Sequence, residues 1–188
     1  MRNFFFLFLG LFGAQAQTSS WSVELSYPAL VDQNFVGANF NGIVEAGTKY
    51  QFWENLSFKI GISLHTGLFK DKEGIQDPTT DFDLLIWTLQ PRIYGVLFLP
   101  TLPQFHPIIG IGYSAVTFFT NGNVMTFFPQ GNETRYGLNA AAGFSLDVSK
   151  QWYFHASYDF IKLSNSGNFT TPYLQNINLV KLGVGYRI

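Results

Sequence analysis

The sequence contains no cysteine and few charged residues. Asp, Glu, Lys and Arg make up 12% of its 188 residues, about half the share found in an ordinary soluble domain. Without cysteine the chain forms no disulfide bond, so packing and its surroundings must stabilise the fold. The net charge of −1 gives no reason to expect a nucleic-acid partner. The length suits one domain.

A long apolar run is also missing after residue 16, so the sequence has no candidate for a transmembrane helix. Hydrophobic residues nevertheless make up 47% of the chain and aromatic residues 18%. Without such a helix, a chain of this composition can cross a membrane only if its backbone polar groups pair with each other in another structure. The closed β-barrel is the other structure that does so within hydrocarbon.

Residues 1–16 have the features of a secretory signal peptide. Arg2 gives a basic start, an apolar run extends over Phe4–Gly13, and Ala14-Gln15-Ala16 supplies the small residues of a cleavage site. The run is too short to span a bilayer as a helix. We expect cleavage directly after this motif and a barrel domain over residues 17–188. We expect no lipid anchor, because no cysteine follows the run.

Apolar and polar residues alternate along eight segments, as in strands with one apolar and one polar face. The predicted strands are 20–29, 42–53, 56–69, 83–99, 106–119, 135–148, 152–163 and 176–188. Pro91 cannot donate to a ladder, and we expect a bulge there. Short connections alternate with long ones, which is typical of outer-membrane barrels with periplasmic short turns.

A soluble lipocalin-like binding barrel would show the same alternation, with its polar face in water. Here the polar face is rich in Gly, Ser and Ala, which suits a crowded interior filled by a few long side chains. Aromatic residues near strand ends on the apolar face fit girdles at two lipid interfaces. The girdle candidates are Trp21, Tyr27, Trp152, Tyr158 and Tyr186. We therefore predict an all-β fold, an eight-stranded antiparallel up-and-down transmembrane β-barrel.

The last segment, Leu182–Ile188, resembles the closing strand of bacterial outer-membrane barrels, although many of these end in Phe. The chain from residue 17 onward is similar to small eight-stranded barrels of the OmpA-transmembrane and OmpX type. Its Ala-Gln-Ala-Gln and Gly-x-Gly-Tyr-Arg motifs resemble the outer membrane β-barrel domain family common in Bacteroidota. The resemblance implies an integral outer-membrane protein that contacts outer-membrane lipids and lipopolysaccharide. It also implies insertion by the barrel-insertion machinery.

An eight-stranded barrel has an interior that side chains just fill, so we expect no diffusion pore. Inward charges predict a plug with a middle and a lower layer. In the middle layer we expect Asp159 to meet Lys181 on the adjacent strand, and Glu45 to approach Arg92 across the lumen. The lower layer comprises Glu24, Lys49, Lys59 and His155.

Catalytic and metal chemistry find little support in the sequence. His155-Ala156-Ser157 resembles the His-x-Ser of lipid A deacylases, but it faces inward near a short turn, far from outer-leaflet lipid. His65, His106 and His155 share no local ligand spacing, so we expect no metal and no cofactor. An acidic group could bind divalent cations weakly, although a solvated loop is the simpler interpretation. Its members are Asp71, Glu73, Asp77, Asp81 and Asp83.

We therefore predict a non-enzymatic protein that is structural or acts through its extracellular loops. The apolar loop residues Met125, Phe127 and Phe128 are candidate contacts for a protein partner or a ligand, and a loop folded down over the barrel rim would explain them equally well. Two alternatives within the membrane remain open: a small subunit of a secretion or uptake assembly, and an enzyme that modifies outer-leaflet lipid A. The soluble lipocalin-like barrel is the third alternative.

Overall fold

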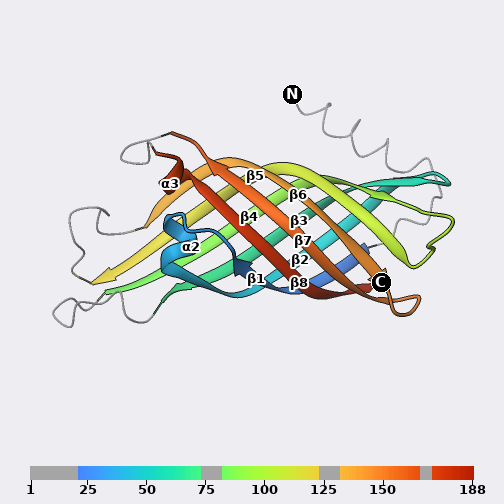
Figure 1. Cartoon of the computed structure of the whole chain (residues 1–188), viewed down its shortest axis with the longest axis horizontal. Coiled ribbons are helices and arrows are strands. Elements are labelled where there is room, and N and C mark those ends of the chain that lie inside the picture. The colour runs from blue at the N-terminus through green and yellow to red at the C-terminus, as the bar shows by residue number, and fades with distance from the viewer. Residues whose placement is uncertain (1–20, 73–81, 123–131, 166–170) are drawn as a thin grey trace, which may run out of the picture.

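The computed structural model describes residues 21–72, 82–122, 132–165 and 171–188. Eight antiparallel strands form a closed barrel in which every strand pairs with its sequence neighbours and β8 returns to β1 (Figure 1). The strands are β1 (Trp21–Leu30), β2 (Phe40–Glu54), β3 (Phe58–Asp71), β4 (Phe82–Leu97), β5 (Phe105–Gly122), β6 (Glu133–Asp147), β7 (Trp152–Leu163) and β8 (Asn176–Arg187). This confirms the predicted eight-stranded up-and-down barrel. The predicted signal peptide lies outside the described residues.

Strand boundaries agree with the predicted segments to within a few residues, but the bulges lie elsewhere. Pro91 pairs with Leu64 in an unshifted β3–β4 register, so the expected bulge is absent. The missing N–H of proline interrupts the β4–β5 ladder locally, because the pairs on either side keep the same register. Register shifts occur instead in β2, at Gly42/Val44 and Gln51/Trp53.

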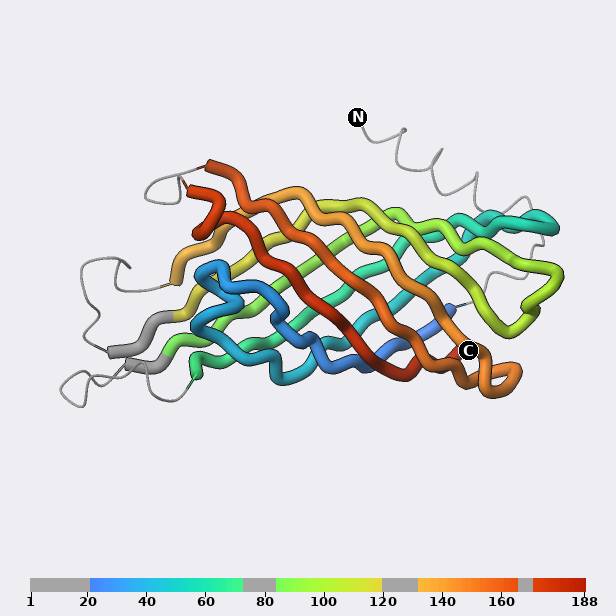
Figure 2. Tube along the Cα trace, in the orientation of Figure 1, coloured from blue at the N-terminus to red at the C-terminus, as the bar shows by residue number. Residues whose placement is uncertain are grey.

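The two ends of the barrel differ in their connections. The short connections 55–57, 98–104 and 148–151 lie together at what we call the turn end, where β8 also finishes. The opposite end, which we call the loop end, carries the long connections and two short helices, α2 (Phe35–Asn39) and α3 (Pro172–Gln175) (Figure 2). Each helix is about one turn long, which is too short to give a helical pattern in the sequence, and neither was predicted. Among the described residues, no helix is both long and apolar enough to cross a membrane.

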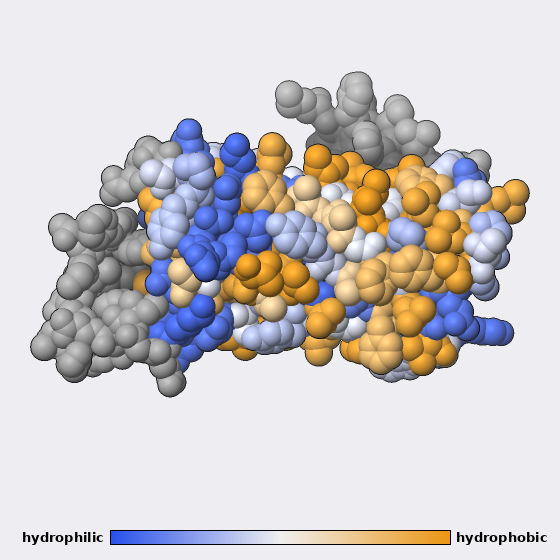
Figure 3. All heavy atoms as spheres, viewed as in Figure 1, coloured by the Kyte–Doolittle hydropathy of each residue, from blue (hydrophilic) through white to orange (hydrophobic). Residues whose placement is uncertain are grey.

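The outward faces of the strands are apolar. Large side chains at outward positions, such as Leu182 and Ile111, are 61% and 65% exposed. Figure 3 shows apolar residues gathered over the body of the barrel, with hydrophilic residues concentrated toward the loop end. In a barrel surrounded by water this pattern would leave a large apolar surface exposed. The faces are therefore those of a membrane barrel and not of the lipocalin-like alternative.

The lumen at the loop end is also apolar, which was not predicted. Strand ends next to the long connections direct large side chains inward, and Val36 of α2 packs with them. This apolar cluster comprises Val36, Phe40, Phe69, Ile86, Val116, Phe118, Ile161, Leu163, Ile177 and Leu179. A continuous apolar run such as Leu84–Trp87 was the available signal, because it means that both faces of a strand are apolar.

Candidate functional site in the barrel lumen

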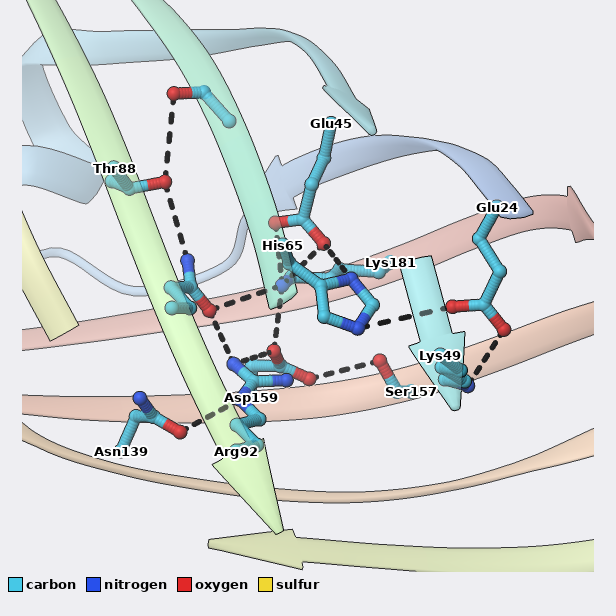
Figure 4. Close-up of polar contacts among 12 residues, drawn as sticks. Glu24, Glu45, Lys49, His65, Thr88, Arg92, Asn139, Ser157, Asp159 and Lys181 are labelled. Atoms are coloured by element: carbon cyan, nitrogen blue, oxygen red, sulfur yellow. Dashed lines mark hydrogen bonds and ion pairs between the residues drawn. The ribbon is translucent and has the colours of Figure 1, made fainter. Parts of the chain in front are cut away.

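Charged side chains from four strands meet in the middle of the lumen (Figure 4). Asp159 of β7 lies 2.5 Å from Arg92 Nη2 of β4 and 2.7 Å from Lys181 Nζ of β8, both distances being to Asp159 Oδ2. The same Lys181 Nζ lies 2.5 Å from Oε2 of Glu45 on β2. All four residues are buried. Arg92, Asp159, Lys181 and Glu45 thus form a continuous ion-pair chain across the barrel.

The predicted middle layer differs from this arrangement in one pairing. Asp159 and Lys181 are in contact, as expected from their adjacent strands. Glu45, however, pairs with Lys181 and with His65 Nδ1, at 3.2 Å, and not with Arg92. The long Lys181 side chain reaches both carboxylates, so its ammonium occupies the place that the prediction gave to Arg92.

Neutral amides complete the hydrogen bonding of the ion-pair chain. Arg92 Nε donates to Asn139 Oδ1 at 2.7 Å, and Asn139 Nδ2 donates to Ser114 Oγ at 2.8 Å. Arg92 Nη2 also donates to Gln90 Oε1. Gln90 and Asn139 are uncharged, so the inward charges that predict the plug did not point to them. These bonds hold the guanidinium in place as the charges are desolvated.

The lower layer is centred on Glu24 of β1. Glu24 Oε1 lies 2.6 Å from Lys49 Nζ and accepts a hydrogen bond from the Tyr153 hydroxyl at 2.9 Å. His65 links the layers, because its Nε2 lies 3.9 Å from Glu24 Oε2 while its Nδ1 contacts Glu45. His155 lines the same small cavity of about 40 Å³ as Glu24.

Lys59 lies apart from the rest of the predicted lower layer. Its Nζ pairs with Glu54 Oε1 at 3.0 Å at the rim of the turn end. The two residues are opposite each other in the β2–β3 ladder, beyond the bulge at Gln51/Trp53. The bulge shifts the register between β2 and β3 by one residue. The sequence of each strand taken alone does not show this shift, so the layer of Lys59 was predicted wrongly.

Two glycines show how the narrow lumen accommodates aromatic rings. A Cβ atom at Gly47 would lie 2.5 Å from His65 Nδ1, and one at Gly185 would lie 2.1 Å from Tyr153 Cζ. Each glycine therefore leaves the space that a ring from the neighbouring strand fills. Small residues facing large ones are expected in an eight-stranded barrel, whose interior is just wide enough for side chains.

The described geometry gives no nucleophile–base pair at His155 and Ser157. Ser157 Oγ donates to Asp159 Oδ1 at 2.8 Å, so its hydroxyl is engaged by the ion-pair chain. His155 Nε2 is buried and has no hydrogen-bond partner among the described residues. Within the same residues, no group of His, Asp and Glu side chains is arranged to hold a metal ion.

Several predicted loop residues lie outside the described residues: Glu73, Asp77, Asp81, Met125, Phe127 and Phe128. The side chain of Asp83 is likewise not described. Asp71 is the described member of the acidic group. It is buried at the end of β3 and not solvated as expected, because the strand extends two residues beyond the predicted segment and β2 pairs with it.

The girdle candidates lie on the outer surface. Trp21 packs on Tyr50 with ring centroids 4.8 Å apart, and Trp152 packs edge-on against Tyr186 at 5.0 Å. Both pairs lie near the turn end. Tyr27, Trp152 and Tyr158 are about half exposed, as is Trp21, whereas Tyr186 is half-buried.

Several known structures share this fold. Ail of Yersinia pestis, crystallised in complex with the heparin analogue sucrose octasulfate, has a TM-score of 0.59 at 16% identity, covering 90% of this chain and 97% of its own. A major outer membrane protein of Thermus thermophilus has a TM-score of 0.58 at 11% identity, covering 92% and 100%. Neisserial surface protein A has a TM-score of 0.50 at 13% identity, covering 92% and 97%. At these identities the likeness shows the fold alone.

A search of curated proteins gives no match to this chain. The family model for the outer membrane protein beta-barrel domain, however, matches residues 4–187. This match covers nearly the whole chain and agrees with the closed barrel, its apolar outer surface and its polar lumen. The chain therefore belongs to the outer membrane protein beta-barrel domain family and is an integral protein of the outer membrane.

Proposed function

We propose that this protein is a non-enzymatic outer-membrane barrel with a closed lumen, which is structural or acts through the connections at its loop end. One observation carries the proposal: the ion-pair chain and the apolar cluster occupy successive levels of the same lumen. Side chains from strands all around the barrel contribute to both levels.

The two levels oppose the passage of solutes in different ways. A solute at the level of Lys181 must separate buried ion pairs, and removing one partner of such a pair typically costs about 3–5 kcal/mol. A solute that passes this level then meets the apolar cluster, where a charged or polar group loses its hydration without compensation. Steady diffusion therefore requires a rearrangement of both levels.

The non-enzymatic part of the proposal is supported by the bonding within the lumen. Ser157 is engaged by Asp159, and its inward position separates it from lipid outside the barrel. A lipid A-modifying enzyme would need a reactive group at the outer surface or rim near the outer leaflet. The long connections at the loop end are the part of the chain that a partner outside the cell can reach.

Planar-bilayer recording tests closure directly. The purified protein should insert without producing a steady ohmic current, while a porin in the same bilayers shows that the assay detects pores. A steady current that increases with the number of inserted barrels would overturn the closed lumen. Lipid A mass spectra from cells with and without the gene test the enzymatic alternative, and a modification that depends on the gene would refute the non-enzymatic assignment.

A further inference from the structure

Each of the three short connections at the turn end exposes one large aliphatic side chain. Leu56 is 99% exposed, Leu102 is 55% exposed and Val148 is 62% exposed. We call these three residues the turn tips. A single exposed leucine is ordinary on a protein surface. Here, however, every short connection carries such a residue, and the three connections lie together at one end of the barrel (Figure 2).

The turn tips lie next to aromatic residues of the outer surface. Val148 N donates to Trp152 O at 3.0 Å, and Phe105 N donates to Leu102 O at the same distance. The aromatic pairs at this end are Trp152 with Tyr186, Phe105 with Phe144, and Trp53 with Phe58. Leu56 belongs to the connection that joins the two strands of the third pair. Aromatic residues at this level mark the membrane interface, so the turn tips continue the lipid-facing surface to the end of the barrel.

The short connections contain little charge. Together they include one charged residue, Lys150, and no carboxylate side chain. At the adjoining strand ends, Glu54 pairs with Lys59, and Asp147 pairs with Arg187. The connections therefore form an apolar surface with a single positive charge. Such a surface suits the headgroup region of a leaflet, where aliphatic side chains meet acyl chains and a lysine reaches lipid phosphate.

The backbone of the short connections is largely paired within the protein. Asn55 Oδ1 accepts hydrogen bonds from the backbone N–H groups two and three residues further along, at 2.9 and 2.8 Å. Ser149 Oγ accepts from the corresponding groups of its own connection at 3.2 and 2.9 Å. In the third connection, Pro100 and Pro103 have no N–H to satisfy. A turn whose N–H groups are paired internally loses less free energy when it leaves bulk water.

The positions of the turn tips favour a lipid leaflet over a protein partner. The connections join β2 to β3, β4 to β5 and β6 to β7, so they are spaced around the circumference of the barrel. A protein partner would need one contiguous apolar patch. A leaflet surrounds the barrel and reaches every connection. Figure 3 shows apolar residues reaching the turn end on the face in view.

We propose that the turn tips insert into the phospholipid leaflet at the turn end, at the boundary between the headgroups and the acyl chains. In outer-membrane barrels the end with short turns faces the periplasm, so this leaflet is the periplasmic one. The lipid-facing surface then includes the connections, and the turn end does not project into the periplasm as a docking surface. This position depends on the outer surface alone and does not depend on a closed lumen.

Depth-dependent fluorescence quenching in phospholipid vesicles tests this position. The chain contains no cysteine, so Leu56→Cys, Leu102→Cys and Val148→Cys each give one site for a thiol-reactive fluorophore. Phosphatidylcholine brominated near the top of its acyl chains, about 5–10 Å below the lipid surface, should quench all three probes. Lys150→Cys is the matched control, because Lys150 is exposed and belongs to the same connection as Val148. Iodide, present on both sides of the membrane, should quench the Val148 probe at least about twofold less than the Lys150 probe, because the leaflet shields the Val148 probe.

Equal quenching by iodide at the turn tips and at Lys150, without quenching by the brominated lipid, would overturn the proposal. The turn tips would then lie in water, where a periplasmic protein could bind them. Stronger quenching by bromines near the ends of the acyl chains than by bromines near the top would also overturn it, because the turn tips would then lie deep in the membrane. Each turn tip is tested separately, so the test remains decisive if one variant fails to fold.

Discussion

Lys181 is the residue whose loss should perturb the lumen most, because one ammonium serves two carboxylates. Its Nζ lies 2.5 Å from Glu45 Oε2 and 2.7 Å from Asp159 Oδ2, and the residue is 2% exposed. Lys181→Met keeps most of the side-chain volume and removes the charge. Removing one partner of a buried pair typically costs about 3–5 kcal/mol, and we expect a loss of this size in the free energy of unfolding.

The two carboxylates should not suffer equally. Asp159 keeps Arg92 at 2.5 Å and the Ser157 hydroxyl at 2.8 Å. Glu45 keeps His65 Nδ1 at 3.2 Å, which is a weaker partner for a buried charge. Adding Glu45→Gln to Lys181→Met should therefore restore more stability than adding Asp159→Asn.

Urea unfolding in lipid vesicles, followed by tryptophan fluorescence, measures all members of this double-mutant cycle. Lys162→Met is the matched control, because Lys162 is an exposed lysine on the neighbouring strand β7. The reasoning would be refuted if Lys181→Met cost no more than Lys162→Met. Strictly additive effects of Lys181→Met and Glu45→Gln would refute it as well.

Three further predictions concern the outer face, the packing of the lumen and the orientation. Leu182→Arg should lower the free energy of unfolding by about 2–4 kcal/mol if the residue lies near the bilayer midplane, and Leu182→Phe should lower it far less. Urea titration measures both, and equal losses would mean that this face does not meet lipid. Gly185→Ala should lower the free energy of unfolding by about 1–3 kcal/mol, because the new Cβ would overlap the Tyr153 ring. Gly110→Ala should be nearly neutral, because the atom nearest to its new Cβ is 3.5 Å away. Similar losses in the two variants would contradict the contact between Gly185 and Tyr153. Ser164→Cys should react with an impermeant maleimide on intact cells and Lys150→Cys should not, and the reverse pattern would invert the proposed topology.

The strands and their faces could be predicted because they depend on a local pattern. Side chains of a strand alternate with period two, so parity assigns each residue to lipid or lumen. The segment 152–163 shows this best, since the predicted bounds equal those of β7 and the inward Asp159 is buried while the outward Phe154 is exposed. Parity needs no knowledge of neighbouring strands.

The partners of the lumen charges depend on the register and tilt between strands. The sequence of a single strand does not determine either of these. Lys181 is opposite Ser157 in the β7–β8 ladder, while Asp159 is opposite Leu179. The contact between Lys181 and Asp159 is therefore diagonal. A long side chain in a narrow lumen can reach several partners. The predicted middle layer therefore contained the right residues, but the pairing of Glu45 with Arg92 was wrong.

In the proposed closed lumen, the apolar cluster should keep the barrel closed even where the ion-pair chain is weakened and the fold is less stable. Lys181→Met disrupts the ion-pair chain but leaves Phe69, Phe118 and Leu179 in place, each at most 1% exposed. Ions that cross the weakened level still meet a level where they cannot be hydrated. We therefore expect Lys181→Met to be less stable than the wild type and still without steady conductance. A barrel closed by charge alone would instead begin to conduct once that charge is removed, so the same variant distinguishes the two forms of closure.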